Sequence, residues 1–279
     1  MKINEMSWKA SDGITIAAQS WEPDQSIKAV VCLVHGLGEH IRRYNHVATA
    51  FTNAGYAVLG ADLRGHGMSE GPRGHTPNYD QYLSDIDLEI DHAKEIFPGK
   101  PIFIYGHSLG GNLVLYYCLK RTPKLAGALV TSPGLKPGEE VPGWKTALAK
   151  ILYSVAPTFT MDNGLDLMNL SHDTKVIDAY RSDPLVHSKI SARFGMDFLN
   201  AGQWIRENAQ KLDIPILLMQ GTADHLVSPE ATREFAKKVK CEITYKEWPD
   251  LYHELHNEFE KATVIQTMID WLDQHTPIA

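Results

Sequence analysis

The hydrophobic positions of the chain form short apolar runs that are separated by longer segments with helical spacing. Six runs are almost wholly apolar: AVVCLVHG, AVLGAD, PIFIYG, GALVTSP, PILLMQG and ITYKEW. Strands that are buried on both faces of a parallel sheet have this character. The earlier run ITIAAQSWE alternates between apolar and polar residues, which predicts a hairpin strand at the edge of the sheet.

Between these runs the apolar residues follow a helical period. In residues 79–97 they recur at intervals of three and four, at Leu83, Ile86, Ile90 and Ala93, which predicts an amphipathic helix. A succession of strand, helix and strand is typical of an α/β fold whose parallel sheet is flanked by helices.

One interval interrupts the alternation. Residues 135–211 contain no clear strand pattern, and Pro137, Gly138, Pro142 and Gly143 mark where the interval begins. We predict a helical cap segment, residues 135–211, inserted between two strands of one sheet. Residues 1–134 and 212–279 then form the two parts of the core.

Charge and composition narrow the class of protein. The chain has 27 Lys and Arg against 34 Asp and Glu, a net charge of -7, so nucleic acid is not an expected partner. We find neither a signal peptide nor an apolar stretch long enough to cross a membrane, and expect a soluble cytoplasmic protein. Cys32, Cys118 and Cys241 lie in apolar surroundings, which is typical of buried thiols.

The motif Gly-His-Ser-Leu-Gly occupies residues 106–110, between the run PIFIYG and the helical segment NLVLYYCLKR. This is the G-x-S-x-G nucleophile elbow in its strand, turn and helix context. Its glycines permit a strained turn that presents the Ser108 hydroxyl at the end of the sheet. The N–H of Leu109, at the start of the helix, can stabilise an oxyanion. We predict that Ser108 is a catalytic nucleophile.

A second oxyanion donor is expected after an earlier strand. In VVCLVHGLGEH, His35 and Gly36 end the strand, and the N–H of Leu37 is the candidate donor. His35 fits a structural histidine that bonds the loop backbone better than it fits a proton carrier. The glycine-rich stretch at residues 61–69 lacks the spacing of a phosphate-binding loop, so we interpret it as a tight turn.

A serine nucleophile needs a base and a carboxylate, which in this fold follow it in the order Asp or Glu, then His. Asp224 comes directly after the run PILLMQG, where a catalytic acid belongs. Asp213 precedes that run and lies at the opposite edge of the sheet. The alternative for Asp224 is an aspartate that only forms a turn.

Four histidines follow Asp224. His225 is its neighbour and cannot easily fold back onto it, and we expect His275 to lie in a mobile tail. His253 and His256 remain, in the segment WPDLYHELHNEFE. His253 leaves the loop first, so we predict that it is the base. The HELH pair is not H-E-x-x-H and has no third ligand, so we predict no metal site.

Several separated segments carry a family resemblance: HGLGEHIRRY, DLRGHGMSEG, GHSLGGNL, DPLVH, GTADHLVSPE and YHELHNE. In order and spacing they resemble the monoacylglycerol lipase and lysophospholipase branch of the α/β-hydrolases, over nearly the whole chain and least at about residues 138–175. The resemblance implies an α/β-hydrolase fold with a mostly parallel eight-stranded sheet flanked by helices and a helical cap insertion. It also implies a triad and an oxyanion hole, formed respectively by Ser108, Asp224 and His253 and by the N–H groups of Leu37 and Leu109.

The same family holds the glycerol end of its substrate with polar side chains. At the matching positions of this chain these are Glu39, Arg43, Tyr180 and His256. A structural interpretation is equally open, in which Glu39 and Arg43 pair within their own loop and Tyr180 supports the cap.

An apolar stripe runs along the first helical part of the cap segment, at Trp144, Leu148, Ile151, Leu152 and Val155. It either packs on the core or, as the resemblance favours, lines an acyl tunnel and exposes apolar surface for transient contact with a micelle or a membrane.

Together these features predict a cytoplasmic serine hydrolase, peripheral at membranes, that cleaves the acyl ester of a monoacylglycerol through an acyl-enzyme. It needs no metal and no organic cofactor. The alternatives are a lysophospholipase, a general carboxylesterase and, outside enzymes, a ligand receptor with the α/β-hydrolase fold. Acyl chain-length preference and oligomeric state do not follow from the sequence.

Overall fold

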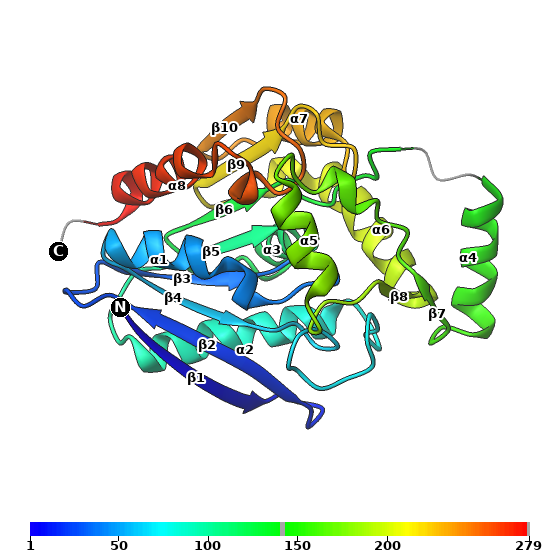
Figure 1. Ribbon diagram of the computed structural model, residues 1–279, viewed down its shortest axis with the longest axis horizontal. Coiled ribbons are helices and arrows are strands. Elements are labelled where there is room, and N and C mark those ends of the chain that lie inside the picture. Colours follow the sequence, from blue (N-terminus) through cyan, green and yellow to red (C-terminus); the bar gives the residue numbers. More distant parts are fainter. Residues whose placement is uncertain (140–142, 278–279) are drawn as a thin grey trace.

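The computed structural model describes residues 1–139 and 143–277 (Figure 1). Its main sheet has eight strands in the order β1-β2-β4-β3-β5-β6-β9-β10. Their bounds are Lys2–Lys9 for β1, Thr15–Glu22 for β2, Ala29–Val34 for β3, Tyr56–Ala61 for β4, Ile102–His107 for β5, Gly127–Thr131 for β6, Ile216–Gly221 for β9 and Ile243–Trp248 for β10.

The six apolar runs all form strands of this sheet, and these six strands, β3, β4, β5, β6, β9 and β10, run parallel to one another. Every residue of β3, β4, β5, β6 and β9 is buried, which explains why no polar alternation is visible in these runs. The predicted parallel α/β sheet is therefore confirmed.

The position of the edge was predicted wrongly. The run ITIAAQSWE forms β2, but β2 lies between β4 and a further antiparallel strand, β1. Most side chains of β1 are exposed, and Trp8 alone in this strand is fully buried. Such a strand has little apolar pattern, so hydropathy could not reveal it.

Helices cover both faces of the sheet. On one face α2 (Asp80–Ile96) and α3 (Leu109–Arg121) pack on side chains such as Val30 and Cys32, and on the other face α1 (Asn45–Asn53) and α8 (Lys261–His275) pack on Val31 and Leu33. Helix α2 confirms the amphipathic helix expected at residues 79–97. Cys118 is buried in the first of these clusters, as predicted, and Cys241 is half-buried beside it.

The cap segment lies between β6 and β9. It contains α4 (Gly143–Val155), β7 (Thr160–Asp162), the 3-10 helix Leu167–Asn169, α5 (Thr174–Ser182), β8 (Lys189–Ser191), α6 (Ala192–Asn208) and the 3-10 helix Ala209–Lys211. Strands β7 and β8 pair antiparallel, so the expectation of a segment without strands was wrong. Three-residue strands are too short to give a period. Pro142 lies outside the described residues.

The packing shows no single boundary between the cap segment and the core. Helix α6 contributes Phe194, Ala201 and Ile205 to the core cluster that contains α2 and α3. Helix α4, by contrast, stands away from the sheet (Figure 1). The limits 135–211 stay a prediction.

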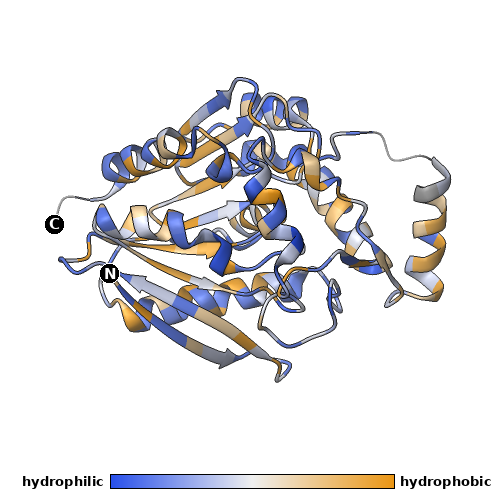
Figure 2. Ribbon diagram, in the orientation of Figure 1, coloured by the Kyte–Doolittle hydropathy of each residue, from blue (hydrophilic) through white to orange (hydrophobic). Residues whose placement is uncertain are grey.

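Most of the apolar stripe of α4 is exposed, and only Leu152 of the five predicted residues is half-buried. Trp144 is 66% exposed and Val155 is 74% exposed, and Leu148 and Ile151 are exposed as well. Figure 2 shows hydrophobic residues along this helix, which contacts the rest of the molecule through α6. The structure therefore fits exposed apolar surface better than a stripe that packs on the core. In the described part of the chain, no helix combines the length and apolar character needed to cross a bilayer.

Candidate active site

The turn between β5 and α3 carries Ser108 in a strained conformation. Its φ of 54° and ψ of -114° lie where residues with a Cβ are rarely found. Two glycines make the turn possible: a Cβ on Gly110 would lie 2.0 Å from the carbonyl oxygen of Val34, and a Cβ on Gly106 would lie 2.3 Å from that of Gly110. The strained turn predicted from the motif is present.

The loop after β3 lies directly against this turn. A Cβ on Gly36 would be 3.4 Å from the Cβ of Ser108, and Leu37 lines the same cavity as Ser108. The N–H of Gly36 donates to Glu39 Oε1 at 2.6 Å, which fixes the loop. Leu37, in the loop after β3, and Leu109, the first residue of α3, therefore both lie next to Ser108.

His253 and Asp224 form a buried pair. Asp224 follows β9, and its Oδ2 lies 2.8 Å from His253 Nδ1. The N–H groups of Leu226 and Val227 donate to Asp224 Oδ1 at 2.9 and 3.0 Å. Burial acts to lower the pKa of His253, but the Asp224 carboxylate outweighs it and raises that pKa above its usual value. A neutral His253 held in this way can accept a proton at Nε2.

His256 has a different environment. It is fully buried, stacks on Tyr44 with 4.7 Å between ring centroids and meets the ring of His107 at 4.8 Å. Neither of its ring nitrogens has a hydrogen-bond partner within the described residues, and it does not line the cavity at Ser108. Its proposed contact with glycerol stays a prediction.

Two further histidines considered in the sequence, His35 and His275, have structural partners. His35 Nδ1 donates to Gly36 O at 2.8 Å and its Nε2 accepts from the N–H of Leu63 at 2.8 Å, as expected for a histidine that holds the loop. His275 was expected in a mobile tail, and this was wrong. It is the last residue of α8 and bonds Trp271 O at 2.7 Å.

A buried charge cluster borders the nucleophile. The Arg43 guanidinium pairs with Glu39 and, through both Nη atoms at 2.7 Å, with Glu254, and it lies 4.7 Å from the centre of the Tyr180 ring. Burial acts to raise the pKa of Glu39, but Arg43 outweighs it and lowers that pKa to about 2. These contacts fit the structural interpretation, in which Glu39 pairs with Arg43 within one loop and Tyr180 supports the cap. Glu39 and Tyr180 also line the cavity, so a role in binding stays open.

Two titratable residues of the cavity were missed in the sequence. Glu254 follows His253 directly, and His107 precedes Ser108, so adjacency to the predicted site was the available signal. Burial and the neighbouring His253 lower the pKa of His107 to about 4, which leaves it uncharged at neutral pH. Its Nδ1 lies 3.0 Å from Thr131 Oγ1.

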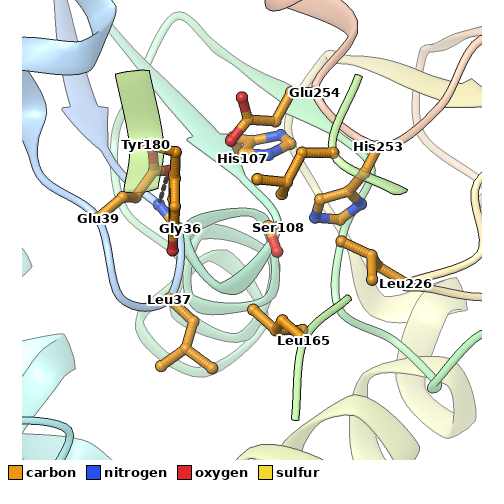
Figure 3. Close-up of a pocket in the computed structure, with 11 residues that line it drawn as sticks. Gly36, Leu37, Glu39, His107, Ser108, Leu165, Tyr180, Leu226, His253 and Glu254 are labelled. Carbon is orange, nitrogen blue, oxygen red and sulfur yellow. Dashed lines mark hydrogen bonds between the residues drawn. The ribbon is translucent and has the colours of Figure 1, made fainter. Parts of the chain in front are cut away.

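A small cavity joins these groups (Figure 3). Its volume is about 20 Å³, roughly the space that one water molecule needs. The side chains of Ser108 and His253 both face it. Its lining consists of Gly36, Leu37, Glu39, His107, Ser108, Leu165, Leu170, Tyr180, Leu226, His253 and Glu254. Because Leu165, Leu170 and Tyr180 belong to the cap segment, admission of an acyl chain requires that segment to move.

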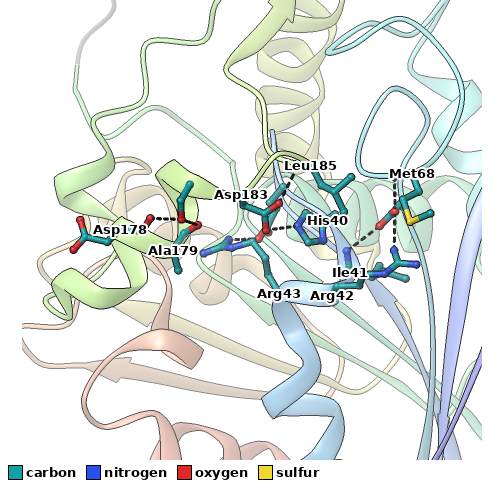
Figure 4. A network of polar contacts seen from close by, with 12 residues as sticks. His40, Ile41, Arg42, Arg43, Met68, Asp178, Ala179, Asp183 and Leu185 are labelled. Atoms are coloured by element: carbon teal, nitrogen blue, oxygen red, sulfur yellow. Dashed lines mark hydrogen bonds and ion pairs between the residues drawn. The ribbon is translucent and has the colours of Figure 1, made fainter.

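The cap segment is tied to the loop that carries His253. The N–H of Glu254 donates to Leu170 O at 2.8 Å. The buried Glu258 carboxylate accepts from the N–H groups of His172 and Tyr252 at 3.0 and 2.8 Å. Elsewhere, His40 Nε2 lies 2.8 Å from Asp183 Oδ2 at the end of α5 (Figure 4). A movement of the cap segment would therefore also displace the loop that carries His253.

The arrangement suits acyl transfer through a serine. In the described residues no group of three or more His, Cys, Asp and Glu side chains is placed to hold a metal ion. The groups that can act on a bound ester are a hydroxyl on a strained turn and an imidazole with a carboxylate partner. The oxyanion hole formed by the N–H groups of Leu37 and Leu109 stays a prediction.

Comparisons with known proteins point the same way. A family profile described as serine aminopeptidase, S33, matches residues 25–260. The monoacylglycerol lipase of Mycolicibacterium smegmatis is 32% identical over 98% of both chains. The crystal structure of Paleococcus ferrophilus monoacylglycerol lipase superposes with a TM-score of 0.84 at 32% identity, covering 99% of this chain and 100% of that one. An uncharacterised abhydrolase domain-containing protein of Dictyostelium discoideum is 38% identical over 95% of this chain, which spans 28% of its length.

The charge cluster makes a prediction about stability. Replacing Arg43 by Met leaves Glu39 and Glu254 buried without their cation, so the free energy of unfolding should fall by about 3 to 5 kcal/mol at pH 7. Glu39 has a lowered pKa, so its contribution is present above about pH 4.5 and is lost as the pH falls toward 2. The difference between wild type and R43M in urea unfolding should shrink over that interval. A difference that is constant with pH would contradict this account.

Proposed function

Since the chain belongs to the α/β-hydrolase family described as serine aminopeptidase, S33, we propose that it is a serine hydrolase that cleaves monoacylglycerols to fatty acid and glycerol. The observation that carries the proposal is the meeting of Ser108, the His253 and Asp224 pair and the buried charge cluster at one cavity. The relatives named monoacylglycerol lipase, matched over nearly their whole length, support this substrate.

The proposed reaction has two steps. In the first, Ser108 Oγ attacks the ester carbonyl while His253 Nε2 takes its proton, and the N–H groups of Leu37 and Leu109 stabilise the oxyanion. His253 then gives the proton to the leaving glycerol oxygen, and the acyl group remains on Ser108. In the second step His253 takes a proton from a water that attacks the acyl-enzyme, and it gives this proton to Ser108 Oγ as the fatty acid leaves. Asp224 orients the imidazole throughout and stabilises its protonated form.

The charge of the cavity favours a neutral alcohol. Two buried carboxylates, Glu39 and Glu254, face one guanidinium, that of Arg43, and the lining contains no Lys or Arg. The cluster therefore carries one net negative charge. A phosphate group needs cationic partners and would meet repulsion here, whereas glycerol hydroxyls can donate hydrogen bonds to carboxylates. This supports monoacylglycerol over the lysophospholipase alternative.

The cap segment supplies the lipid side of the proposed site. Leu165 and Leu170 border the cavity, and the exposed stripe of α4 offers apolar surface. Exposed apolar helices of this kind bind lipid interfaces. In this proposal α4 makes transient contact with a micelle or a membrane while the monoacylglycerol enters.

The nucleophile can be tested by labelling. A fluorophosphonate probe should attach to one site per chain, and Ser108→Ala should abolish both labelling and hydrolysis of p-nitrophenyl butyrate. A turnover that stops after one equivalent of product in the wild-type protein would favour the ligand-receptor alternative. Labelling that survives in S108A would refute the assignment of Ser108.

The choice of headgroup can be tested with two substrates that have the same acyl chain. A unit charge about 6 Å from the cluster at an effective dielectric constant of about 20 costs about 3 kcal/mol. We therefore expect kcat/KM for 1-oleoylglycerol to exceed that for 1-oleoylglycerol-3-phosphate by about 100-fold.

The variant Glu254→Gln removes the net negative charge of the cluster and should reduce this ratio by up to about 100-fold, whatever its effect on either rate alone. Glu247→Gln is the matched control, because Glu247 pairs with Arg233 and does not line the cavity. An unchanged ratio in E254Q would show that charge does not select the headgroup.

A further inference from the structure

Gln220 is a buried amide that contacts the carboxylate of the proposed catalytic acid. It lies in β9, one residue before the strand ends, and is fully buried. Its Nε2 donates to Asp224 Oδ2 at 2.9 Å. The same oxygen lies 2.8 Å from His253 Nδ1. Gln220 and His253 therefore share one oxygen of Asp224. A change in the hydrogen bond from Gln220 alters the hydrogen bond between this oxygen and His253.

The orientation of this amide is determined by its neighbours. Thr232 Oγ1, on α7 (Pro229–Lys238), donates to Gln220 Oε1 at 3.0 Å, and Gln220 Nε2 also donates to Gly221 O at 3.2 Å. The flipped amide would place Oε1 against an ionised carboxylate, which only accepts hydrogen bonds. The hydroxyl, the amide, the carboxylate and the imidazole thus form one chain of hydrogen bonds from α7 to the base.

Such a chain has a chemical consequence for the base. A hydrogen bond donated to Oδ2 withdraws negative charge from the oxygen that stabilises the protonated imidazole. It also holds Oδ2 in place, while the N–H groups of Leu226 and Val227 hold the other oxygen of Asp224. Loss of the Gln220 hydrogen bond should strengthen the attraction between Asp224 and the protonated imidazole, and should leave Oδ2 less well placed.

We propose that Gln220 is a positioning residue that, through Asp224, fixes the orientation of His253 and limits how strongly it holds its proton. The proposal rests on the proposed function of His253 as the base. No substrate contact is involved, because Gln220 does not line the cavity.

The other charged and titratable groups around His253 are distinct from this chain. They are His107 from β5, Glu39 from the loop after β3, and Glu254 and His256 from the segment that carries His253, with Arg43 paired to both carboxylates. None of them has a hydrogen bond to Gln220 or Thr232 within the described residues. A substitution at Gln220 therefore changes the Asp224 side of His253 alone.

The test is the pH dependence of kcat/KM for p-nitrophenyl butyrate in Gln220→Met, which keeps the volume of the side chain but removes its polar atoms. The base must be neutral to act, so a higher pKa of His253 moves the acid limb of the profile to higher pH. We expect a shift of about 0.5 to 1 pH unit, the size of one hydrogen bond, and a plateau lowered by up to about tenfold.

Thr232→Val is the matched control. It removes the hydroxyl that binds Gln220 Oε1 but leaves the N–H that faces Asp224, so its acid limb should stay within about 0.2 pH unit of the wild-type value. A lower plateau in Q220M with an unmoved acid limb would reduce Gln220 to a structural residue and overturn the proposal.

A second measurement does not depend on turnover. In the wild-type protein, the side-chain N–H of Gln220, observed by NMR after ¹⁵N-glutamine labelling, should shift in step with the titration of the His253 ring. A Gln220 signal that does not respond to that titration would overturn the proposal even if Q220M fails to fold. Absence of ester turnover in the wild-type protein, with this coupling present, would instead refute the proposed function and leave the role of Gln220 intact.

Discussion

The close approach of backbone segments at the β5 to α3 turn is the constraint on which the site depends. The virtual Cβ of Gly110 lies 2.0 Å from the carbonyl oxygen of Val34, so no larger residue can bring the start of α3 against the end of β3. The backbone N–H of Ser108 donates to Thr131 O at 3.0 Å, and Ser108 O accepts from Gly134 N at 3.0 Å. These contacts hold the serine between the ends of β3 and β6.

The same constraint extends to the base. Ser132, directly after β6, also has a positive φ, 43°, and its hydroxyl donates to His253 O at 2.8 Å. Strained residues are retained where the surrounding structure determines them. Here two strained serines lie at adjacent strand ends, one carrying the proposed nucleophile and the other holding the loop of the proposed base. Residues at the carboxyl ends of β3, β5 and β9 therefore line one cavity, and Ser132 at the end of β6 holds the loop beside it.

The sequence predicted those features that depend on local pattern. The apolar runs gave the buried parallel strands, because burial on both faces requires unbroken hydrophobicity. The serine motif and the order of Asp224 and His253 gave a site whose geometry is compatible with acyl transfer. Strand β1 was missed because it is exposed, and β7 and β8 because they are short. Glu254 and Gln220 were missed for another reason: their partners are set by tertiary contact. Arg43 and Glu254 are separated by 211 positions, and no local pattern reports such a pair.

In the proposed function this site cleaves one acyl ester next to a small neutral alcohol, beneath a cap segment that leaves a cavity of about 20 Å³. The most direct test is the rate of oleate release from monooleoylglycerol, dioleoylglycerol and trioleoylglycerol, measured with the same protein at the same concentration of ester bonds. We expect monooleoylglycerol to be hydrolysed at least about tenfold faster than trioleoylglycerol, a difference of about 1.4 kcal/mol in the barrier. Equal rates on monooleoylglycerol and on a trioleoylglycerol emulsion would contradict it.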